Sequence, residues 1–308
     1  MAIRTVTIGG VPRPMGWMEA PKEVDRVMGL LPHPVFGITA RPLQDSGKGK
    51  VALLYEAVRK VVGRDLIHSQ TIGDCVSHGF SSAIDTLACC QIAAGLRERF
   101  PGENATEVLY AGSRVEIGRG GCGRGDGSIG AWAARAVTEY GTLARGKYGP
   151  IDLTTYSGDR ARKWGMPNQG IPDELESILR EHPVRTTSMV TSYEEARDAL
   201  ANGYPVPVCS NAGFASTRDK DGFARRSGSW AHCMAFLGVD DASGRPGLLC
   251  QNSWGADWIS GPKRHDQPDG SFWVDADTVD RMLREQDSFA LSGFVGFPGV
   301  DYDFLAGL

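Results

Sequence analysis

The stretch Gln70-Thr71-Ile72-Gly73-Asp74-Cys75-Val76-Ser77-His78 places a cysteine at the end of a glycine-containing turn. Apolar residues then recur three or four positions apart, at positions 76, 80, 83, 84, 87, 88 and 92. This spacing predicts one apolar face of a helix over residues 75–95. Cys75 would lie in its first turn, where unpaired amide N–H groups and the helix dipole favour a thiolate. Such a cysteine is either a core residue or a nucleophile.

Composition limits the classes of protein to which the chain can belong. Of its 308 residues, 41% are hydrophobic and 23% are charged, which is typical of a folded globular protein. The 33 basic and 37 acidic residues give a formal net charge of −4, so we expect no nucleic-acid partner. No uncharged apolar run approaches the ~20 residues that span a bilayer, and the start lacks the apolar core of a secretory signal. We therefore expect no membrane association and a cytoplasmic or virion-associated location.

The cysteines point to the same kind of compartment. Seven of them are scattered along the chain, and none forms a Cys-x-x-Cys pair of the kind that binds zinc. An odd number of dispersed thiols favours a reducing compartment with free cysteines. We expect no cofactor and no metal.

The first half of the chain is predicted to be mainly helical. Residues 1–50 are rich in proline and glycine and are interpreted as an extended N-terminal arm, with one short helix near 21–30. Residues 51–155 form the predicted helical lobe, with helices at 51–62, 75–95, 104–117 and 129–140. A glycine-rich loop at 118–127 interrupts them.

The second half is predicted to be rich in strands. A capping box, Ser192 followed by Glu195, starts a helix over 192–202. Apolar runs predict strands at 204–209, 233–239, 247–252, 271–275 and 289–296. We therefore predict an α+β chain of two lobes, with residues 156–297 as the β-rich lobe and 298–308 as a C-terminal tail.

Three residues of these two halves together suggest chemistry. A thiol nucleophile needs a nearby imidazole to become a thiolate, and the imidazole needs a third group to hold its ring. His232 begins one predicted strand, and Asn252 ends the next. Two neighbouring antiparallel strands would place these side chains together. By contrast, we expect His78 to serve polar packing and Asp85 to make a buried structural hydrogen bond.

These residues lie in runs that resemble the motifs of papain-like cysteine peptidases. Asn252-Ser253-Trp254-Gly255 resembles the asparagine motif of that family, and residues 231–239 resemble its histidine strand. Residues 70–80 resemble its cysteine motif, and residues 120–127 its substrate-binding glycine loop. The resemblance covers about residues 65 to 297, keeps the order of the family's motifs, and is nearest to bacterial or phage-type relatives. It implies a two-lobe fold with the cysteine on the helical lobe.

The resemblance also implies roles for particular residues. Cys75 would be the nucleophile, His232 the general acid and base, and Asn252 the residue that orients the imidazole. Gln70 would donate its side-chain amide to the oxyanion of a peptide substrate.

Three further residues would bind or shield the substrate. Gly125 and Gly127 would pair with an extended substrate strand, because a side chain there would block close approach. Trp254 would line the site and shield Asn252 from water. The implied activity is hydrolysis of peptide bonds in a peptide or protein substrate.

Departures from the family pattern leave other functions open. Gln70 precedes Cys75 by five residues, one fewer than the family spacing, and Val76 replaces the usual aromatic residue. The alternative hypothesis is a structural or binding component of a larger assembly, such as a phage particle, that binds its partner through the N-terminal arm and has weak or no activity. A third is a transferase or amidase that uses the same cysteine and histidine.

Overall fold

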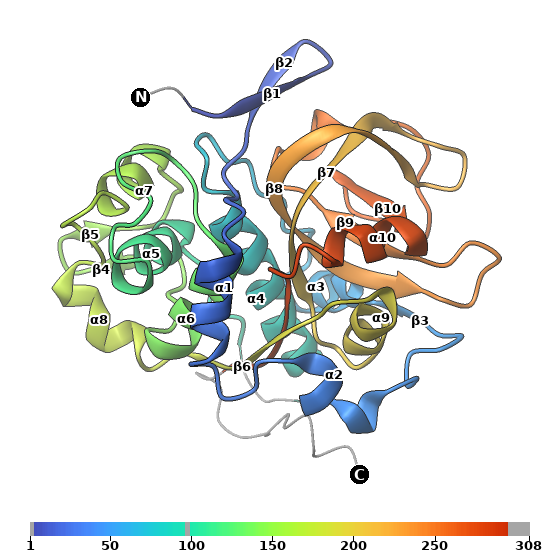
Figure 1. The fold of residues 1–308 in the computed structure, drawn as a ribbon, viewed down its shortest axis with the longest axis horizontal. Helices are drawn as coiled ribbons and strands as arrows, with labels where there is room; N and C mark the ends of the chain where they lie inside the picture. The colour runs from blue at the N-terminus through green and yellow to red at the C-terminus, as the bar shows by residue number, and fades with distance from the viewer. Residues whose placement is uncertain (1–2, 96–98, 295–308) are drawn as a thin grey trace.

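The predicted helix after Cys75 is α4, Cys75–Ala93, in a computed structural model that describes residues 3–95 and 99–294. It runs through the middle of the molecule, between a helical lobe and a β-lobe (Figure 1). The apolar face is as predicted, but the opposite face is buried as well, including Ser77, His78, Ser81 and Asp85. The prediction of a single buried face was therefore too narrow, because both lobes pack on this helix.

The helical lobe surrounds one side of α4. It contains α5 (Thr106–Ala111), the π-helical turn η2 (Gly112–Ile117), α6 (Gly130–Glu139), α7 (Gly158–Trp164) and α8 (Asp173–Leu179), with the short strands β4 (Lys147–Tyr148) and β5 (Ile151–Asp152). The predicted helix at 104–117 thus changes to a wider turn after residue 111. Leu175 and Leu179 of α8 join an apolar cluster with Val108 of α5. The helical lobe therefore continues beyond residue 155, because α8 buries its apolar face against it.

The β-lobe is built on β8, Ala224–Asp240, which pairs with three other strands. They are β7 (Val206–Arg218), β9 (Gly247–Gln251) and β3 (Val51–Leu53), and β10 (Ser271–Asp275) pairs with β9 on the outside. The predicted helix at 51–62 is therefore α3 (Leu54–Val62) preceded by a short strand, since Val51 pairs with Asp240. Strand β8 starts nine residues before the predicted position because β7 continues to pair with it across irregular register.

A second antiparallel pair, β6 (Val184–Met189) with β11 (Phe289–Phe294), lies outside that sheet. The sequence of β6 shows little alternation of apolar and polar residues, so no strand was predicted there. Helix α9 (Tyr193–Ala201) is capped as predicted, with Ser192 Oγ accepting from the Glu195 N–H at 3.2 Å. Helix α10 (Ala276–Leu283) and the 3₁₀ turn η3 (Ala256–Trp258) complete the lobe.

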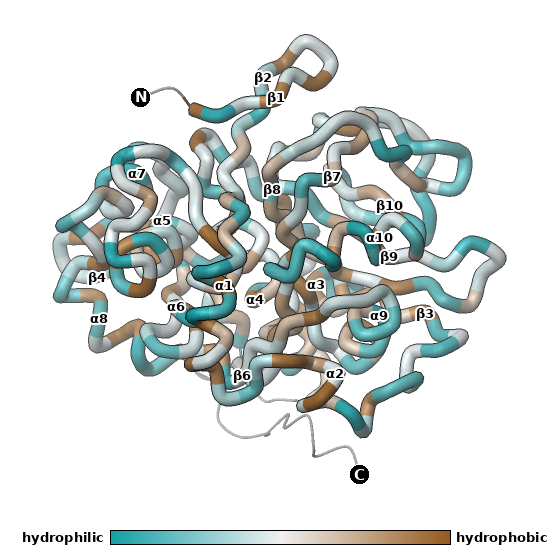
Figure 2. The backbone as a smooth tube through the Cα atoms, viewed as in Figure 1, coloured by the Kyte–Doolittle hydropathy of each residue, from teal (hydrophilic) through white to brown (hydrophobic). Residues whose placement is uncertain are grey.

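The N-terminal residues are more ordered than an extended arm. They form a hairpin of β1 (Thr5–Ile8) and β2 (Val11–Pro14), then α1 (Pro21–Met28), α2 (Phe36–Thr39) and the 3₁₀ turn η1 (Arg41–Leu43). Helix α1 lies in front of α4 and is mostly hydrophilic in Figure 2, whereas its Val24 and Val27 are buried. The arm thus packs on the body of the protein. The predicted tail at 298–308 lies outside the described residues.

None of the helices within residues 3–95 and 99–294 has the length and apolar character that crossing a membrane requires.

Close packing of α4 on β8 depends on Gly79. A methyl group on its Cα would lie 2.8 Å from both Cys233 Sγ and the Met234 carbonyl oxygen. We therefore expect Gly79→Ala to lower the free energy of unfolding by about 1–3 kcal/mol, because the strand must move to admit it. Urea denaturation of both chains measures this change.

Gly29→Ala is the matched control. Its added methyl group meets only atoms 3.8 Å or more away, and its backbone is right-handed. We expect this control to keep the parent stability within about 0.5 kcal/mol. A stability for Gly79→Ala equal to that of the control would contradict the close contact.

Candidate active site

His232 and Asn252 meet at the edge of the β-lobe. Strands β8 and β9 are antiparallel neighbours, and Ala235 pairs with Gln251 in their register. His232 Nε2 lies 2.8 Å from Asn252 Oδ1. That oxygen also accepts the backbone N–H of Ser253 at 2.7 Å. The amide of Asn252 is therefore fixed with its oxygen toward the imidazole, as the two-strand prediction requires.

Cys75 is the first residue of α4 and faces the same strand. Its Sγ accepts the backbone N–H of Cys233, the residue after His232, at 3.4 Å. His232 Nδ1 is buried without a hydrogen-bond partner among the described residues. The cysteine, the histidine and the asparagine are thus collected at one junction of α4, β8 and β9, and one imidazole nitrogen remains available.

Burial favours the neutral forms of Cys75 and His232. It raises the pKa of the Cys75 thiol well above its ordinary value, with smaller contributions from nearby Cys233 and Asp74. Burial also lowers the pKa of His232 to about 4, against the opposing effect of its bond to Asn252. Both shifts favour a thiol and a neutral imidazole, because a charged pair is costly in a buried site.

Trp254 covers the histidine. Its ring centroid lies 4.5 Å from that of His232, and Trp230 and Trp258 pack around it at 4.8 and 5.4 Å. Trp254 is buried, so it shields the bond between His232 and Asn252 from solvent. This is the position that the resemblance implies for it.

Gln70 lies beside the motif that contains Trp254, but its amide is not free. Its Nε2 donates to the Ile72 carbonyl at 2.8 Å and to the Pro14 carbonyl at 3.3 Å. Its Oε1 accepts the Ser253 hydroxyl at 2.5 Å. The Pro14 oxygen also accepts the Trp254 indole N–H at 2.9 Å. A carbonyl of the arm therefore occupies the donors that an incoming carbonyl would use.

The arm continues through the junction between the lobes. The Trp17 N–H donates to the Ala231 carbonyl at 3.1 Å, next to His232. On the other side, Ser128 donates to Gly16 O at 2.8 Å and accepts from Met18 N at 2.9 Å. The backbone N–H of Gly16 acts on the Cys75 thiol and opposes part of the rise in its pKa. The segment 13–18 therefore binds to both lobes across the cysteine.

The two glycines that were predicted to bind an extended chain, Gly125 and Gly127, differ in their contacts with the arm. A methyl group on Gly127 would lie 2.7 Å from the Gly16 carbonyl, so this glycine does allow an extended chain to approach. Gly125 makes no such contact; its carbonyl accepts from Arg114 Nη2 at 2.7 Å. Ser128, which the sequence prediction missed, makes the backbone pair with the arm. Its position between the glycines and the next helix was the available signal.

Trp17 fills a deep pocket with a carboxylate at its base. The indole is 1% exposed, and its Nε1 donates to Asp287 Oδ2 at 2.7 Å. Asp287 also accepts the N–H groups of Gly130 and Ala131 at the start of α6, at 2.7 and 2.6 Å. Burial raises the pKa of Asp287 to about 7, and the three N–H donors oppose that rise. No sequence pattern indicated this pocket.

The seven cysteines are free, and Cys122 of the glycine loop contacts Met18 Sδ at 3.5 Å. Within the described part of the chain, no three His, Cys, Asp or Glu side chains gather in a group that could hold a metal ion.

Solved structures share this fold. Xylellain, a cysteine protease from Xylella fastidiosa, aligns with a TM-score of 0.55 and 14% identity over 95% of this chain and 98% of its own. Digestive procathepsin L 3 of the Tenebrio molitor larval midgut aligns with a TM-score of 0.52 and 14% identity over 79% of this chain and 69% of its own. No protein-family model and no curated protein sequence matches the chain. The protein therefore has the papain-like α+β fold, and the predicted resemblance is confirmed at the level of the fold.

The arm reaches Cys75 only because residue 16 has no side chain. A methyl group there would lie 1.8 Å from the Gly73 carbonyl oxygen, which is backbone and cannot turn aside. We expect Gly16→Ala to weaken arm binding by about 1–3 kcal/mol, which increases the open population roughly 5- to 150-fold. The rate at which iodoacetamide alkylates Cys75, followed by peptide mass spectrometry, should rise accordingly.

Gly244→Ala, at an exposed turn with no atom within 4 Å of the added methyl group, serves as the control. Equal alkylation rates in both variants would show that the arm does not limit access to the thiol.

Proposed function

We propose that the protein is a papain-like cysteine peptidase whose N-terminal segment 13–18 occupies its active-site cleft. The observation that carries this proposal is the junction of Cys75, His232 and Asn252, with the Asn252 oxygen 2.8 Å from the imidazole. The fold of the two cysteine protease relatives supports it. In this proposal the described structure is a latent state.

Chemistry would begin when a substrate carbonyl replaces the arm. Cys75 Sγ attacks the carbonyl carbon, and His232 Nδ1 takes the thiol proton. The C–N bond then breaks as His232 returns that proton to the leaving amine, which leaves a thioester on Cys75. Water attacks the thioester, gives its proton to His232, and the C–S bond breaks to restore the thiol and release a carboxylic acid.

Release of the arm would also change the electrostatics of the pair. Desolvation is the largest cause of both pKa shifts, so water admitted to the cleft favours the thiolate and the imidazolium. The same movement frees Gln70 Nε2 and Trp254 Nε1 from the Pro14 carbonyl. Both donors could then bind the oxyanion or a neighbouring substrate carbonyl. Latency and activity are therefore linked through one segment.

The central test is removal of the nucleophile. In the Gly16→Ala chain we expect Cys75→Ala to reduce peptide hydrolysis by about 10³-fold or more and to abolish labelling by the thiol-directed epoxide E-64. A fluorogenic peptide assay and intact-mass measurement report the two effects. Cys90→Ala, a change near the end of the same helix, should leave both unchanged. Hydrolysis by the Cys75→Ala chain at the parent rate would refute the mechanism.

The pocket that Trp17 fills predicts a substrate preference. A substrate side chain without an N–H group would leave the buried Asp287 carboxylate one donor short, at a cost of about 1–3 kcal/mol. We therefore expect peptides with Trp or Arg at that position to exceed matched Phe peptides in kcat/KM by about 10-fold or more. Asp287→Asn should remove most of the difference. Equal kcat/KM values in the parent would rule out this role.

The second candidate function is a binding or structural protein that has kept the fold and lost turnover. The observation that favours it is the anchoring of the arm, since Trp17 is as deeply buried as the core itself. If the Gly16→Ala chain exposes a reactive Cys75 but cleaves no member of a mixed peptide library, this second function is favoured. A transferase or amidase would instead consume an acyl donor in the presence of an added amine.

A further inference from the structure

Four buried polar side chains form a line behind Cys75. Asp74, His78 and Asp85 lie on or beside α4, and His68 lies on the segment that leads to Gln70. Their exposed fractions are 0%, 2%, 1% and 7%. Packing or a local hydrogen bond was the expected role for His78 and Asp85. The prediction for Asp85 is confirmed by its buried bonds to Asn104, and the structure also places both residues in one group of neighbouring polar side chains.

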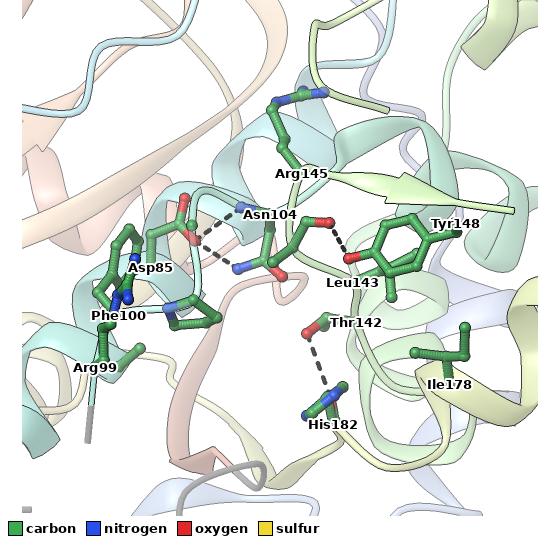
Figure 3. Close-up of a pocket in the computed structure, with 14 residues that line it drawn as sticks. Asp85, Arg99, Phe100, Asn104, Thr142, Leu143, Arg145, Tyr148, Ile178 and His182 are labelled. Atoms are coloured by element: carbon green, nitrogen blue, oxygen red, sulfur yellow. Dashed lines mark hydrogen bonds between the residues drawn. The ribbon is translucent and has the colours of Figure 1, made fainter. Parts of the chain in front are cut away.

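The contacts run from the nucleophile end to the far end of the line. His78 Nε2 lies 3.4 Å from Asp74 Oδ2, and His78 Nδ1 lies 3.1 Å from His68 Nδ1. His68 Nε2 lies 3.9 Å from Asp85 Oδ2. The other oxygen of Asp85 accepts the backbone and side-chain N–H groups of Asn104 at 3.0 and 2.5 Å (Figure 3). The order is therefore carboxyl, imidazole, imidazole, carboxyl.

The contact between the two Nδ1 atoms limits the number of protons in the line. One nitrogen must donate and the other must accept, so the link holds one proton. Each Nε2 faces a carboxyl oxygen, at 3.4 Å for His78 and at 3.9 Å for His68. The four nitrogens can therefore hold at most three protons without breaking the contact between the two Nδ1 atoms. At most one of the two rings can then be an imidazolium.

Geometry favours His78 over His68 as the ring that would carry such a charge. Its Nε2 is 0.5 Å nearer to a carboxyl oxygen than that of His68 (3.4 against 3.9 Å). Burial lowers the pKa of His68 well below its ordinary value, and it raises the pKa of Asp85 to about 8. Burial therefore favours the neutral forms at the Asp85 end, and the pair that can be charged is Asp74 with His78, at the end next to the nucleophile.

Asp74 also holds the turn that presents Cys75. Aspartate is a favoured N-cap residue, yet its side chain makes no cap bond to α4. Its Oδ2 instead accepts the Tyr156 hydroxyl at 2.9 Å, and that hydroxyl accepts the Thr71 N–H at 3.2 Å. The carboxylate therefore connects the turn 70–75 to Tyr156 and to His78.

We propose that Asp74 and His78 form a buried ion pair that positions the nucleophile and sets how readily Cys75 ionises. The carboxylate next to the thiol opposes the thiolate, and the imidazolium one turn along the helix favours it. The two partners therefore act in opposite directions. This inference rests on the proposed function, because it concerns the same nucleophile.

Other charged or titratable groups face this pair and must be considered with it. Around His78 and Cys75 they are His68, Tyr156, His232, Cys209 and Cys233, and around His68 they are Asp85, Glu103 and Arg145.

The test is the pH dependence of Cys75 alkylation by iodoacetamide in the full-length chain, in both the parent and the Gly16→Ala background. The midpoint is the pH at which the alkylation rate of Cys75 reaches half of its maximum. Asp74→Asn removes the negative charge and should shift this midpoint to lower pH. His78→Asn removes the positive charge and should shift it to higher pH. Each shift should be about half a pH unit or more. Asp74→Asn with His78→Asn together should return the midpoint close to that of the parent.

A merely structural role predicts a different result. Loss of packing would change the alkylation rate at every pH and leave the midpoint in place. Unmoved midpoints, or shifts of both single variants in the same direction, would overturn the proposal. If circular dichroism shows that His78→Asn does not fold, the Asp74→Asn variant alone tests the proposal. A downward shift of its midpoint would support the ion pair, and an unmoved or raised midpoint would overturn it. Asp85→Asn, at the neutral end of the line, should move the midpoint least.

Alkylation requires no turnover, so the two proposals can fail separately. Opposite midpoint shifts without peptide hydrolysis would leave the ion pair established and the peptidase function refuted. Hydrolysis that depends on Cys75, together with unmoved midpoints, would support the peptidase function and refute the ion pair.

Discussion

Exclusion of water from the first turn of α4 is the constraint on which the rest of the site depends. Both lobes pack on this helix, and the segment 13–18 closes the remaining side. Burial is accordingly the largest cause of the pKa shifts at Cys75 and His232, which keep the pair neutral. In the proposed function, admission of water to this junction would favour the charged forms of Cys75 and His232 without any change in the positions of the two residues.

Closure of the junction depends on a few places where backbone meets backbone. Gly16 lies against the Gly73 carbonyl, and Gly127 lies against the Gly16 carbonyl. No side chain could be accommodated at either contact. Trp17 then anchors the segment through its bond to the buried Asp287 carboxylate. These residues therefore contact both lobes and complete the core, which explains why the arm is an ordered part of the fold.

Polar residues on α4 contact buried partners that the hydrophobic pattern of the sequence could not indicate. A helix between two lobes has no face that meets water, so each polar side chain needs a partner inside the protein. In the line of side chains behind Cys75, His78 contacts His68, and Asp85 accepts from Asn104. Asp74 joins this line and makes no cap bond to the helix. The polar side chains of α4 therefore extend, through this line of contacts, to Asp74 beside Cys75.

The sequence by itself determined the central helix, several of the other elements, and which strands bring His232 and Asn252 together. Spacing predicted α4, capping predicted α9, and apolar runs predicted β9 and β10, because these depend on neighbours within a few residues. The paired strands also placed His232 beside Asn252. Only the tertiary structure decided that residues 13–18 lie between the two lobes, that Ser128 pairs with them, and that the Pro14 carbonyl accepts from Gln70. Those contacts join residues far apart in the chain, and no local pattern records which distant backbone will approach closely enough to exclude water.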